Sequence, residues 1–465
     1  MPTPDPQAVD LLIEARWVLP IAPAARALAD HAVAVREGRI VALGPTAELD
    51  ARFAPRERVR RAAHVLLPGF VNAHTEAALT VLRACSPAGA AHDAIADTFP
   101  EEQLLTPDLA RAGAQLALAE MLRAGITSFA SRDAYPQETA RLASALRMRA
   151  AIGLPVSEQA AGRANGATAY LGRAEQIWDE YRSDPAVCLY FAPDAPLALR
   201  DATLAHVRTV ADELDARIAL PLHRSVAEIA AARARFGRRP LERLHALGLL
   251  RPGFVGLHMN HLDAADLELI ERTGMAVVAC ARAALRLAHA SPPLAALSEA
   301  GVPLGLGSGS PLTVFVPDLL GEARAAVWAL AAQRARGSGD AAGHDAAPDR
   351  DDAARALELA TLGSARALGL AAKVGSIETG KAADLIAIDL QALGPLHATT
   401  LAEAVLFGAT RDRVSDVWIG GRAAVSSGQL LALDEEELLA AARQLAAHLP
   451  TVGFAWQARH AAPEG

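Results

Sequence analysis

The residues best suited to chemistry in this chain are its histidines. The 465 residues include 14 histidines, which leaves ample room for a metal site, because neutral imidazole is a common ligand of zinc and related metals. One short apolar segment leads to His74, and another leads to His258 and His261. His258 and His261 could both serve a site, or one could be a buried, hydrogen-bonded imidazole and the other a surface residue. Position along the fold, more than number, decides between these alternatives.

Other catalytic chemistry finds less support in the sequence. Ser308 and Ser310 stand in a glycine-rich turn and have no adjacent base, so the sequence does not indicate a serine nucleophile. The same turn lacks the Lys-Ser/Thr pair of a phosphate-binding loop. The three cysteines are far apart and form no CxxC pair, which is typical of reduced residues in a cytosolic protein.

Composition and charge narrow the class of protein. Apolar residues make up 52% of the chain but aromatic residues only 4%. This composition is typical of helices that pack closely against strands, and it excludes an intrinsically disordered chain. The net charge of -8 and the pI near 6.0 give no basic footprint for nucleic acid or an anionic membrane. No long uncharged apolar run and no secretory leader are evident. We therefore expect a soluble cytoplasmic protein.

The order of elements predicts the fold class. Short strands separated by turn signals occupy the first seventy residues, including a Glu37-Gly38 turn between two strands. From about residue 105 to 307, strands alternate with helical patterns, the first of which ends at Gly125. About eight such units predict an α/β fold with a parallel (β/α)8 barrel. Strand signals return after residue 370, and a helix is expected from Asp434 to Leu449.

Several motifs in this order carry a family resemblance. LLPGFVNAHTE, FAPDAPL, LHMNHL, GVPLGLGSG and GSIETGKAADLIAID resemble the amidohydrolase superfamily, and most closely its methylthioadenosine/S-adenosylhomocysteine deaminase and triazine chlorohydrolase branch. The resemblance spans nearly the whole chain. It implies a distorted (β/α)8 TIM barrel with a small β-sandwich domain formed by both chain ends. The implied boundaries are 1–68 and 371–432 for the β-sandwich, 69–370 for the barrel, and 433–465 for a C-terminal helix and tail.

The resemblance also implies an activity, a cofactor and partners. Members of this branch hydrolyse C–N or C–Cl bonds of nitrogen heterocycles with one zinc or iron ion at the carboxyl end of the barrel. The metal lowers the pKa of its bound water from 15.7 to about 7, and a nearby acid passes the proton to the leaving amine. The implied partner is a small nitrogen heterocycle, and a homodimer is expected because many relatives pair through their barrels.

Carried over position by position, the family's metal ligands are mostly replaced. The His-x-His motif of the first barrel strand corresponds to His74 and Glu76, so that a carboxylate stands at the second ligand position. The His-x-x-Glu motif of the fifth strand falls on Pro221 and Arg224, and neither can take over the metal-ligand or general-acid role. The Asp of the eighth strand corresponds to Gly309, which has no side chain to ligate a metal.

Other family positions keep a polar group. His258 matches the histidine that orients the hydroxide and polarises the substrate. Asp194 stands where the family has a substrate-facing histidine, and Glu102 stands near the position at which the deaminases have an acid that contacts a ribose. We therefore interpret Asp194 and Glu102 as candidate substrate-binding residues and His258 as the candidate catalytic residue.

Two main hypotheses follow for function. The first is a homologue with a degenerate metal centre that is not an ordinary deaminase and binds a small molecule. The second is an active hydrolase of cyclic C–N bonds with a rearranged metal site, in which His223, two residues beyond Pro221 and on the same face of an extended strand, joins His74, Glu76 and His258. The alternative, which ligand geometry favours, is that His223 is a loop histidine in contact with solvent. A weaker third hypothesis is metal-free catalysis at the altered barrel mouth.

Overall fold

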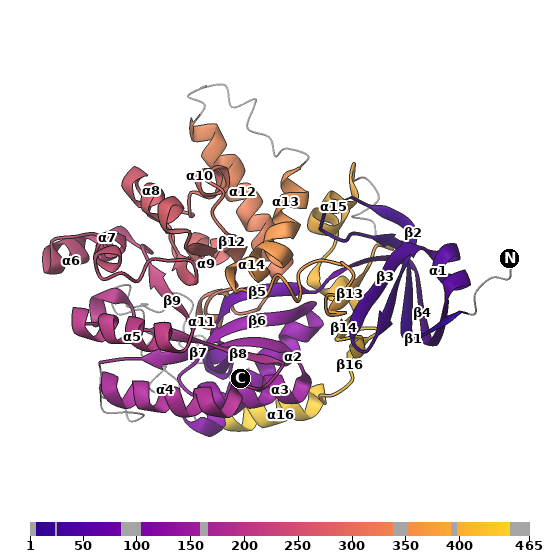
Figure 1. Ribbon diagram of the computed structural model, residues 1–465, viewed down its shortest axis with the longest axis horizontal. Helices are drawn as coiled ribbons and strands as arrows, with labels where there is room; N and C mark the ends of the chain where they lie inside the picture. Colours follow the sequence, from indigo (N-terminus) through magenta and orange to yellow (C-terminus); the bar gives the residue numbers. More distant parts are fainter. Residues whose placement is uncertain are drawn as a thin grey trace, which may run out of the picture.

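The structure is a computed structural model that describes residues 6–23, 26–84, 104–158, 166–337, 351–391 and 398–446. Two sheets of eight strands each organise these residues. One sheet forms a barrel surrounded by helices, and the other forms a smaller domain beside it from both ends of the chain (Figure 1). The α/β fold expected from the sequence, a (β/α)8 barrel with a β-domain built from both ends, is confirmed.

The smaller domain joins the two ends of the chain in a single strand order, β16-β15-β14-β13-β4-β1-β2-β3. Its first half pairs antiparallel with its second half where β4 meets β13, with Pro68 opposite Leu385. Only β1 and β4 are parallel, and helix α1 (Thr46–Arg52) lies between β3 and β4 in the chain. The strands are β1 (Gln7–Val18), β2 (Leu28–Arg36), β3 (Arg39–Pro45), β4 (Phe53–Pro68), β13 (Leu385–Asp389), β14 (Val414–Ile419), β15 (Arg422–Ser426) and β16 (Gln429–Leu430).

The turn predicted at Glu37-Gly38 connects β2 and β3. Both residues have left-handed backbone, with φ of 51° and 73°, and a two-residue hairpin turn with positive φ at both positions matches the twist of the flanking strands. A Cβ atom at Gly38 would lie 3.0 Å from the carbonyl oxygen of Gly420. Glycine is therefore required there by the close approach of a second loop as well as by its backbone conformation.

The barrel strands are parallel and follow one another in chain order. They are β5 (Phe70–Thr75), β6 (Ile126–Arg132), β7 (Arg149–Val156), β8 (Val187–Pro193), β9 (Arg217–Leu222), β10 (Phe254–His258), β11 (Ala276–Ala279) and β12 (Leu304–Leu306). A parallel bridge between Thr75 and Gly309 links the first strand to the segment after the last. Because all carboxyl ends of parallel strands meet at one edge, the residues that follow these strands gather at one mouth of the barrel.

Helices cover the outside of the barrel (Figure 1). They are α2 (Pro107–Arg123), α3 (Pro136–Leu146), α4 (Ala167–Tyr181), α5 (Asp201–Glu213), α6 (Val226–Phe236), α7 (Pro240–Ala246), α8 (Ala264–Thr273), α9 (Ala281–Arg286), α10 (Leu294–Glu299), α11 (Pro311–Val314), α12 (Leu319–Gly337), α13 (Asp352–Glu358) and α14 (Ser364–Ala367). Side-chain caps begin several of them. Thr106 accepts a hydrogen bond from the Leu109 amide at α2, and Ser225 does the same for the Glu228 amide at α6.

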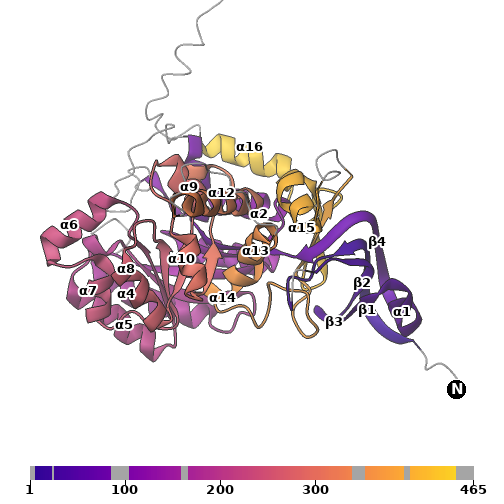
Figure 2. The ribbon, with the colours of Figure 1, turned by 90° about the horizontal axis from the view of Figure 1, so that it is seen from above.

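The last helices complete the fold. Helix α15 (Leu401–Glu403) precedes β14, and α16 (Glu435–Ala446) follows β16. The expected C-terminal helix is thus present as far as Ala446, and residues 447–449 of its expected range lie outside the described residues. Figure 2 shows α16 beside α2 of the barrel, to which it is tied by an ion pair between Arg123 and Glu435 at 2.5 Å. Within the described residues, no helix is both long and apolar enough to cross a membrane.

Apolar side chains pack on both surfaces of the barrel wall. The outward-facing side chains include Phe129, Phe191 and Phe254, which are fully buried between strands and helices. A separate cluster fills the inside of the barrel and consists largely of small residues, with Tyr190 as its one aromatic member among the described residues. Large aromatic side chains therefore pack between the strands and the helices, while mostly small side chains line the inside of the barrel.

Candidate active site at the carboxyl end of the barrel

Most of the candidate residues predicted from the sequence lie at the carboxyl ends of barrel strands. His74 is the next-to-last residue of β5 and His258 ends β10; Arg132, which the sequence did not single out, ends β6. Asp194 and His223 directly follow β8 and β9. All therefore occupy the edge of the barrel where sites form in this architecture. Glu102 lies outside the described residues.

His74 and His258 face each other across this mouth. Their ring centroids are 5.6 Å apart and the ring planes meet at 86°, an edge-to-face arrangement. His258 and Met259 have left-handed backbone, with φ of 70° and 57°, which is uncommon for residues other than glycine. The Met259 amide donates to the Leu222 carbonyl at 3.0 Å and helps to hold this conformation. A strained segment held in place at a strand end is typical of functional sites.

Arg132 connects two of the predicted site residues. Its guanidinium lies 3.4 Å from Glu76 Oε1 and donates a 2.8 Å hydrogen bond to Asp194 Oδ1. The three side chains are at most 14% exposed, so little solvent screens these charges. The sequence interpretation did not include Arg132. The available signal was an arginine at the end of the apolar segment Ile126–Ser131, followed by Asp133.

Asp133 ties the backbone after Glu76 to the end of β6. Its carboxylate accepts hydrogen bonds from the Ala78 amide at 2.9 Å, from Ser131 Oγ at 2.7 Å and from Thr139 Oγ1 at 2.8 Å. Burial raises the pKa of Asp133, while these hydrogen bonds oppose the shift. The network fixes the chain that carries Glu76 beside the strand that carries Arg132, which explains how the two side chains meet.

His223 is held by a different set of residues. Its Nδ1 atom is 3.1 Å from the His261 carbonyl oxygen, and the Leu241 amide donates to its Nε2 atom at 3.3 Å. Because a carbonyl oxygen can only accept, this pattern requires the neutral tautomer with the proton on Nδ1. Burial lowers the pKa of His223, and the nearby carboxylate of Asp266 opposes this shift.

Those contacts determine the place of His223. Its side chain is fully buried and lies next to Arg239, which pairs with Asp266 at the start of α8. The structure therefore does not bring His223 to His74 and Glu76, and it differs from the expectation of a solvent-facing loop residue. The physical reason is that the starts of α7 and α8 present an amide and a polar network that bind both ring nitrogens.

The positions that correspond to the family's other metal ligands are Pro221 and Gly309, and neither supplies a ligating side chain. Pro221 lies within β9, and the loop that follows is held by Glu228, which accepts hydrogen bonds from the His223 and Arg224 amides at 3.1 and 2.8 Å. Arg224 is itself buried. These contacts organise the end of β9 without supplying a metal ligand from Pro221.

Gly309 contributes its backbone to closure of the barrel. Its amide donates to the His74 carbonyl at 3.0 Å, and its φ is 71°. The preceding residue is fixed to β5 as well: the Ser308 amide donates to Asn72 Oδ1 at 2.9 Å, and Asn72 Nδ2 donates to Ser308 Oγ at 2.8 Å. The turn after β12 is therefore fixed to the strand that carries His74 by one main-chain hydrogen bond and by the Asn72 side chain.

Two sets of contacts organise the polar side chains at the barrel mouth. His74 meets His258, and Arg132 joins Glu76 to Asp194. Across the residues that the structure describes, no three His, Cys, Asp or Glu side chains are grouped so that they could hold a metal ion. The arrangement offers hydrogen-bond donors, carboxylates and imidazoles to a small polar molecule.

One protein-family model matches most of the chain. The sequence model described as "Amidohydrolase family" matches residues 65–424. This range covers the barrel and includes parts of the smaller domain on both sides of it. The chain belongs to the amidohydrolase family. A second model, described as an imidazolonepropionase-like composite domain of bacteria, matches residues 32–54 of the smaller domain.

Individual members of the amidohydrolase family are similar over almost the whole chain. A 5-methylthioadenosine/S-adenosylhomocysteine deaminase of Teredinibacter turnerae is 34% identical over 443 residues, covering 94% of this chain and 97% of that protein. The corresponding deaminase of Saccharophagus degradans is 32% identical and covers 92% and 94%. The family resemblance expected from the sequence is thereby confirmed.

Solved structures give the same result for the fold. An adenosine deaminase from Xanthomonas campestris with bound zinc superposes with a TM-score of 0.86 at 36% identity, covering 94% of this chain and 98% of that one. An atrazine chlorohydrolase from Arthrobacter aurescens complexed with zinc gives a TM-score of 0.80 at 20% identity, covering 94% and 100%. The second likeness concerns the fold alone.

Proposed function

We propose that this amidohydrolase binds a nitrogen heterocycle at the carboxyl end of its barrel and is not an ordinary zinc-dependent deaminase. The observation that carries the proposal is the ion pair between Arg132 and Glu76 at 3.4 Å. Glu76 stands at a family ligand position, and a guanidinium already neutralises its charge. The donor set around it does not fit a divalent metal.

Electrostatics support this proposal. A divalent ion bound to Glu76 would lie close to the Arg132 guanidinium, and like charges about 4 Å apart repel by on the order of 4 kcal/mol per pair of unit charges at an intermediate dielectric. Both side chains are about nine-tenths buried, so water offers little screening. The metal would have to displace Arg132, which is also held by Asp194.

The remaining ligand positions support it as well. Pro221 and Gly309 offer no side-chain donor, and both ring nitrogens of His223 are already in contact with other residues. A zinc site open for catalysis needs three protein ligands and a water. Without a metal, the water at the site would keep a pKa near 15.7 in place of about 7, so that hydroxide would be scarce at neutral pH.

The choice of ligand rests on the relatives and on the polar groups that remain. The curated relatives are named for 5-methylthioadenosine and S-adenosylhomocysteine, both of which carry an adenine. Asp194 can accept from ring or exocyclic N–H groups, and the His74–His258 pair can donate to or accept from ring nitrogens. An adenine-like heterocycle therefore matches the chemistry of the barrel mouth.

A second candidate function is an active hydrolase of cyclic C–N bonds that uses a rearranged metal site. It is favoured by the 34% identity to a named deaminase over nearly the full chain. It requires Arg132 to leave Glu76, and His223 to give up its contacts with Leu241 and His261.

Calorimetry and ammonia release with 5′-methylthioadenosine test these alternatives. We expect the purified full chain to bind the nucleoside, to release no ammonia, and to bind about tenfold more weakly after Asp194→Asn, because a hydrogen bond to a charged group is lost. Asp201→Asn is the matched control, since Asp201 is 62% exposed and pairs with Arg243. Steady release of ammonia would support the second candidate, and absence of nucleoside binding would reject the first.

A further inference from the structure

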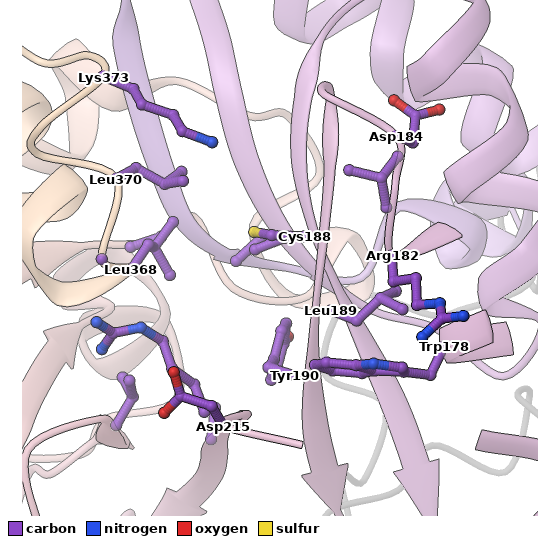
Figure 3. Close-up of a pocket in the computed structure, with 18 of the residues that line it drawn as sticks. Trp178, Arg182, Asp184, Cys188, Leu189, Tyr190, Asp215, Leu368, Leu370 and Lys373 are labelled. Carbon is purple, nitrogen blue, oxygen red and sulfur yellow. The ribbon is translucent and has the colours of Figure 1, made fainter. Parts of the chain in front are cut away.

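A cavity of about 380 Å³ opens at the other end of the barrel, away from the candidate site. Cys188 is the second residue of β8 and Arg217 the first of β9, so the opening lies at the amino ends of the parallel strands. Figure 3 shows Cys188 near its centre, with Tyr190 on the same strand and Lys373 reaching toward it from the opposite side. Leu368 and Leu370, from the segment after α14, form part of the wall.

The cavity exists because alanines occupy inward-facing positions of the barrel. Large branched side chains usually fill the interior of such barrels in layers. Here four strands each contribute an alanine to the cavity wall, namely Ala73, Ala130, Ala151 and Ala219, all of them buried. Unfilled apolar space costs stability, so a cavity of this size is better explained by an occupant than by packing alone.

Two cations give the cavity a polar end. Arg217 and Lys373 both line it. The Arg217 guanidinium lies over Gly369, where even a Cβ atom would come within 2.3 Å of it, and it donates to the Ala367 carbonyl at 3.5 Å. In the parts of the chain described here, neither cation has a carboxylate within ion-pair distance. Both charges are thus available to an anion.

Among the described residues, no side chain of the cavity forms an ion pair with Arg217 or Lys373, although two aspartates also line it. Burial raises the pKa of the Cys188 thiol, although Lys373 and Arg217 oppose the shift, so the thiol stays neutral at physiological pH. Burial lowers the pKa of Arg217, but a guanidinium remains protonated in proteins. Asp184 and Asp215 also line the cavity, and Asp215 acts electrostatically on Arg217. Their charges would repel a dianion such as phosphate more strongly than a monoanion.

We propose that this cavity binds a small amphipathic monocarboxylate, with its carboxylate on Arg217 and Lys373 and its apolar part among the alanines. Arginine presents paired donors that match a carboxylate, and the apolar walls replace water around a hydrocarbon tail. The two cations come from the first residue of β9 and from the segment after α14, while Ala73 and Leu257 of the wall directly precede His74 and His258. The carboxylate would therefore bind at the amino end of the barrel, and the nucleoside proposed above at its carboxyl end.

Calorimetric titration of the full chain with octanoate and with 1-octanol tests this proposal. Octanoate should bind. 1-Octanol has the same number of carbons but no charge, so its affinity should be at least about tenfold lower. Arg217→Gln should weaken octanoate binding by a similar factor. Arg182→Gln is the matched control: Arg182 also lines the cavity, but it is largely exposed and pairs with Asp179 at 3.6 Å, so octanoate binding should not change.

Two further variants keep the test decisive if Arg217→Gln does not fold. Lys373→Gln removes the other cation, and Ala151→Leu fills the apolar part of the cavity, so each should also weaken octanoate binding. The proposal is overturned if octanoate does not bind, if 1-octanol binds equally well, or if Arg182→Gln weakens binding as much as the cavity variants. None of these outcomes depends on binding or turnover of a nucleoside at the other mouth.

Discussion

Arg132 donates a 2.8 Å hydrogen bond to Asp194, and both side chains are at least 86% buried. The same guanidinium faces Glu76, a residue at a metal-ligand position of the amidohydrolase family. A protein cation thus joins two carboxylates at the mouth of the barrel. This relationship underlies the proposal that the barrel mouth binds a ligand without a metal.

The ion-pair network should contribute strongly to folding. We expect Arg132→Met to lower the free energy of unfolding by about 3 kcal/mol, because it leaves two buried carboxylates without their cation. Urea denaturation measures this change. Arg366→Met is the control, since Arg366 and its partner Glu358 are 51% and 40% exposed and an exposed pair contributes less than about 1 kcal/mol. Equal losses in the two variants would contradict the prediction.

His223 should be structural. His223→Ala leaves the buried Leu241 amide without its acceptor and removes one of the two donors to the His261 carbonyl, which keeps the hydrogen bond from Arg239, so we expect a loss of about 2 kcal/mol in the free energy of unfolding. Binding of 5′-methylthioadenosine should persist in the folded variant. A variant that stays stable but loses bound zinc or iron would instead place His223 in a metal site.

Glu322 should make stability depend on pH. Its side chain is fully buried and accepts from the Arg282 amide at 3.1 Å, and burial raises its pKa from 4.5 to about 8. The folded state keeps the proton up to about pH 8, whereas the unfolded chain loses it near 4.5. The contribution of Glu322 to stability is therefore complete below pH 4.5 and is lost as pH rises through 8.

Denaturation of variants at pH 5 and pH 8 tests this dependence. The natural chain should lose up to a few kcal/mol of stability over this interval, and Glu322→Gln should remove most of that loss. Glu268→Gln, at an exposed position, should leave the pH dependence as it is in the natural chain. A Glu322→Gln profile parallel to that of the natural chain would show that Glu322 ionises normally.

Restoring one family ligand should not restore a metal centre. Gly309→Asp places a carboxylate at the family position, where a Cβ atom would lie 3.6 Å from its nearest neighbour, in ordinary contact. The φ of 71° costs about 1 kcal/mol for a residue with a side chain. We expect a folded protein that binds no stoichiometric zinc, because Pro221 still supplies no ligand and Arg132 still neutralises Glu76. Zinc uptake at one equivalent would contradict this expectation.

The fold could be predicted where local signals agree with tertiary structure. Glu37-Gly38 predicted the hairpin between β2 and β3, and the alternation of strands and helices predicted the barrel. The first part of β4 was not predicted, since Arg56, Glu57 and Arg58 hide a strand whose charges are balanced by neighbouring carboxylates such as Glu14. Helix α6 was also missed, because its alanines and arginines give weak apolar periodicity.

The site could be predicted only in part, for a physical reason. The motifs of the family resemblance located His74, Asp194 and His258, and the structure places all three at the carboxyl ends of their strands. The sequence did not indicate the hydrogen-bond and ion-pair partners of the site side chains. Arg132 meets Glu76 because Asp133 fixes two neighbouring segments, and His223 is held by the Leu241 amide at the start of α7 and by the His261 carbonyl before α8. Such contacts arise from tertiary packing.

The zinc and iron content of the natively purified chain tests the central claim most directly. The protein should be produced with both metals supplied and then analysed by mass spectrometry, with Arg132→Met treated in parallel. We expect far less than one equivalent of either metal in the natural chain, because Arg132 already neutralises Glu76. One equivalent per chain, retained through gel filtration, would contradict the account and establish a metal centre at the barrel mouth.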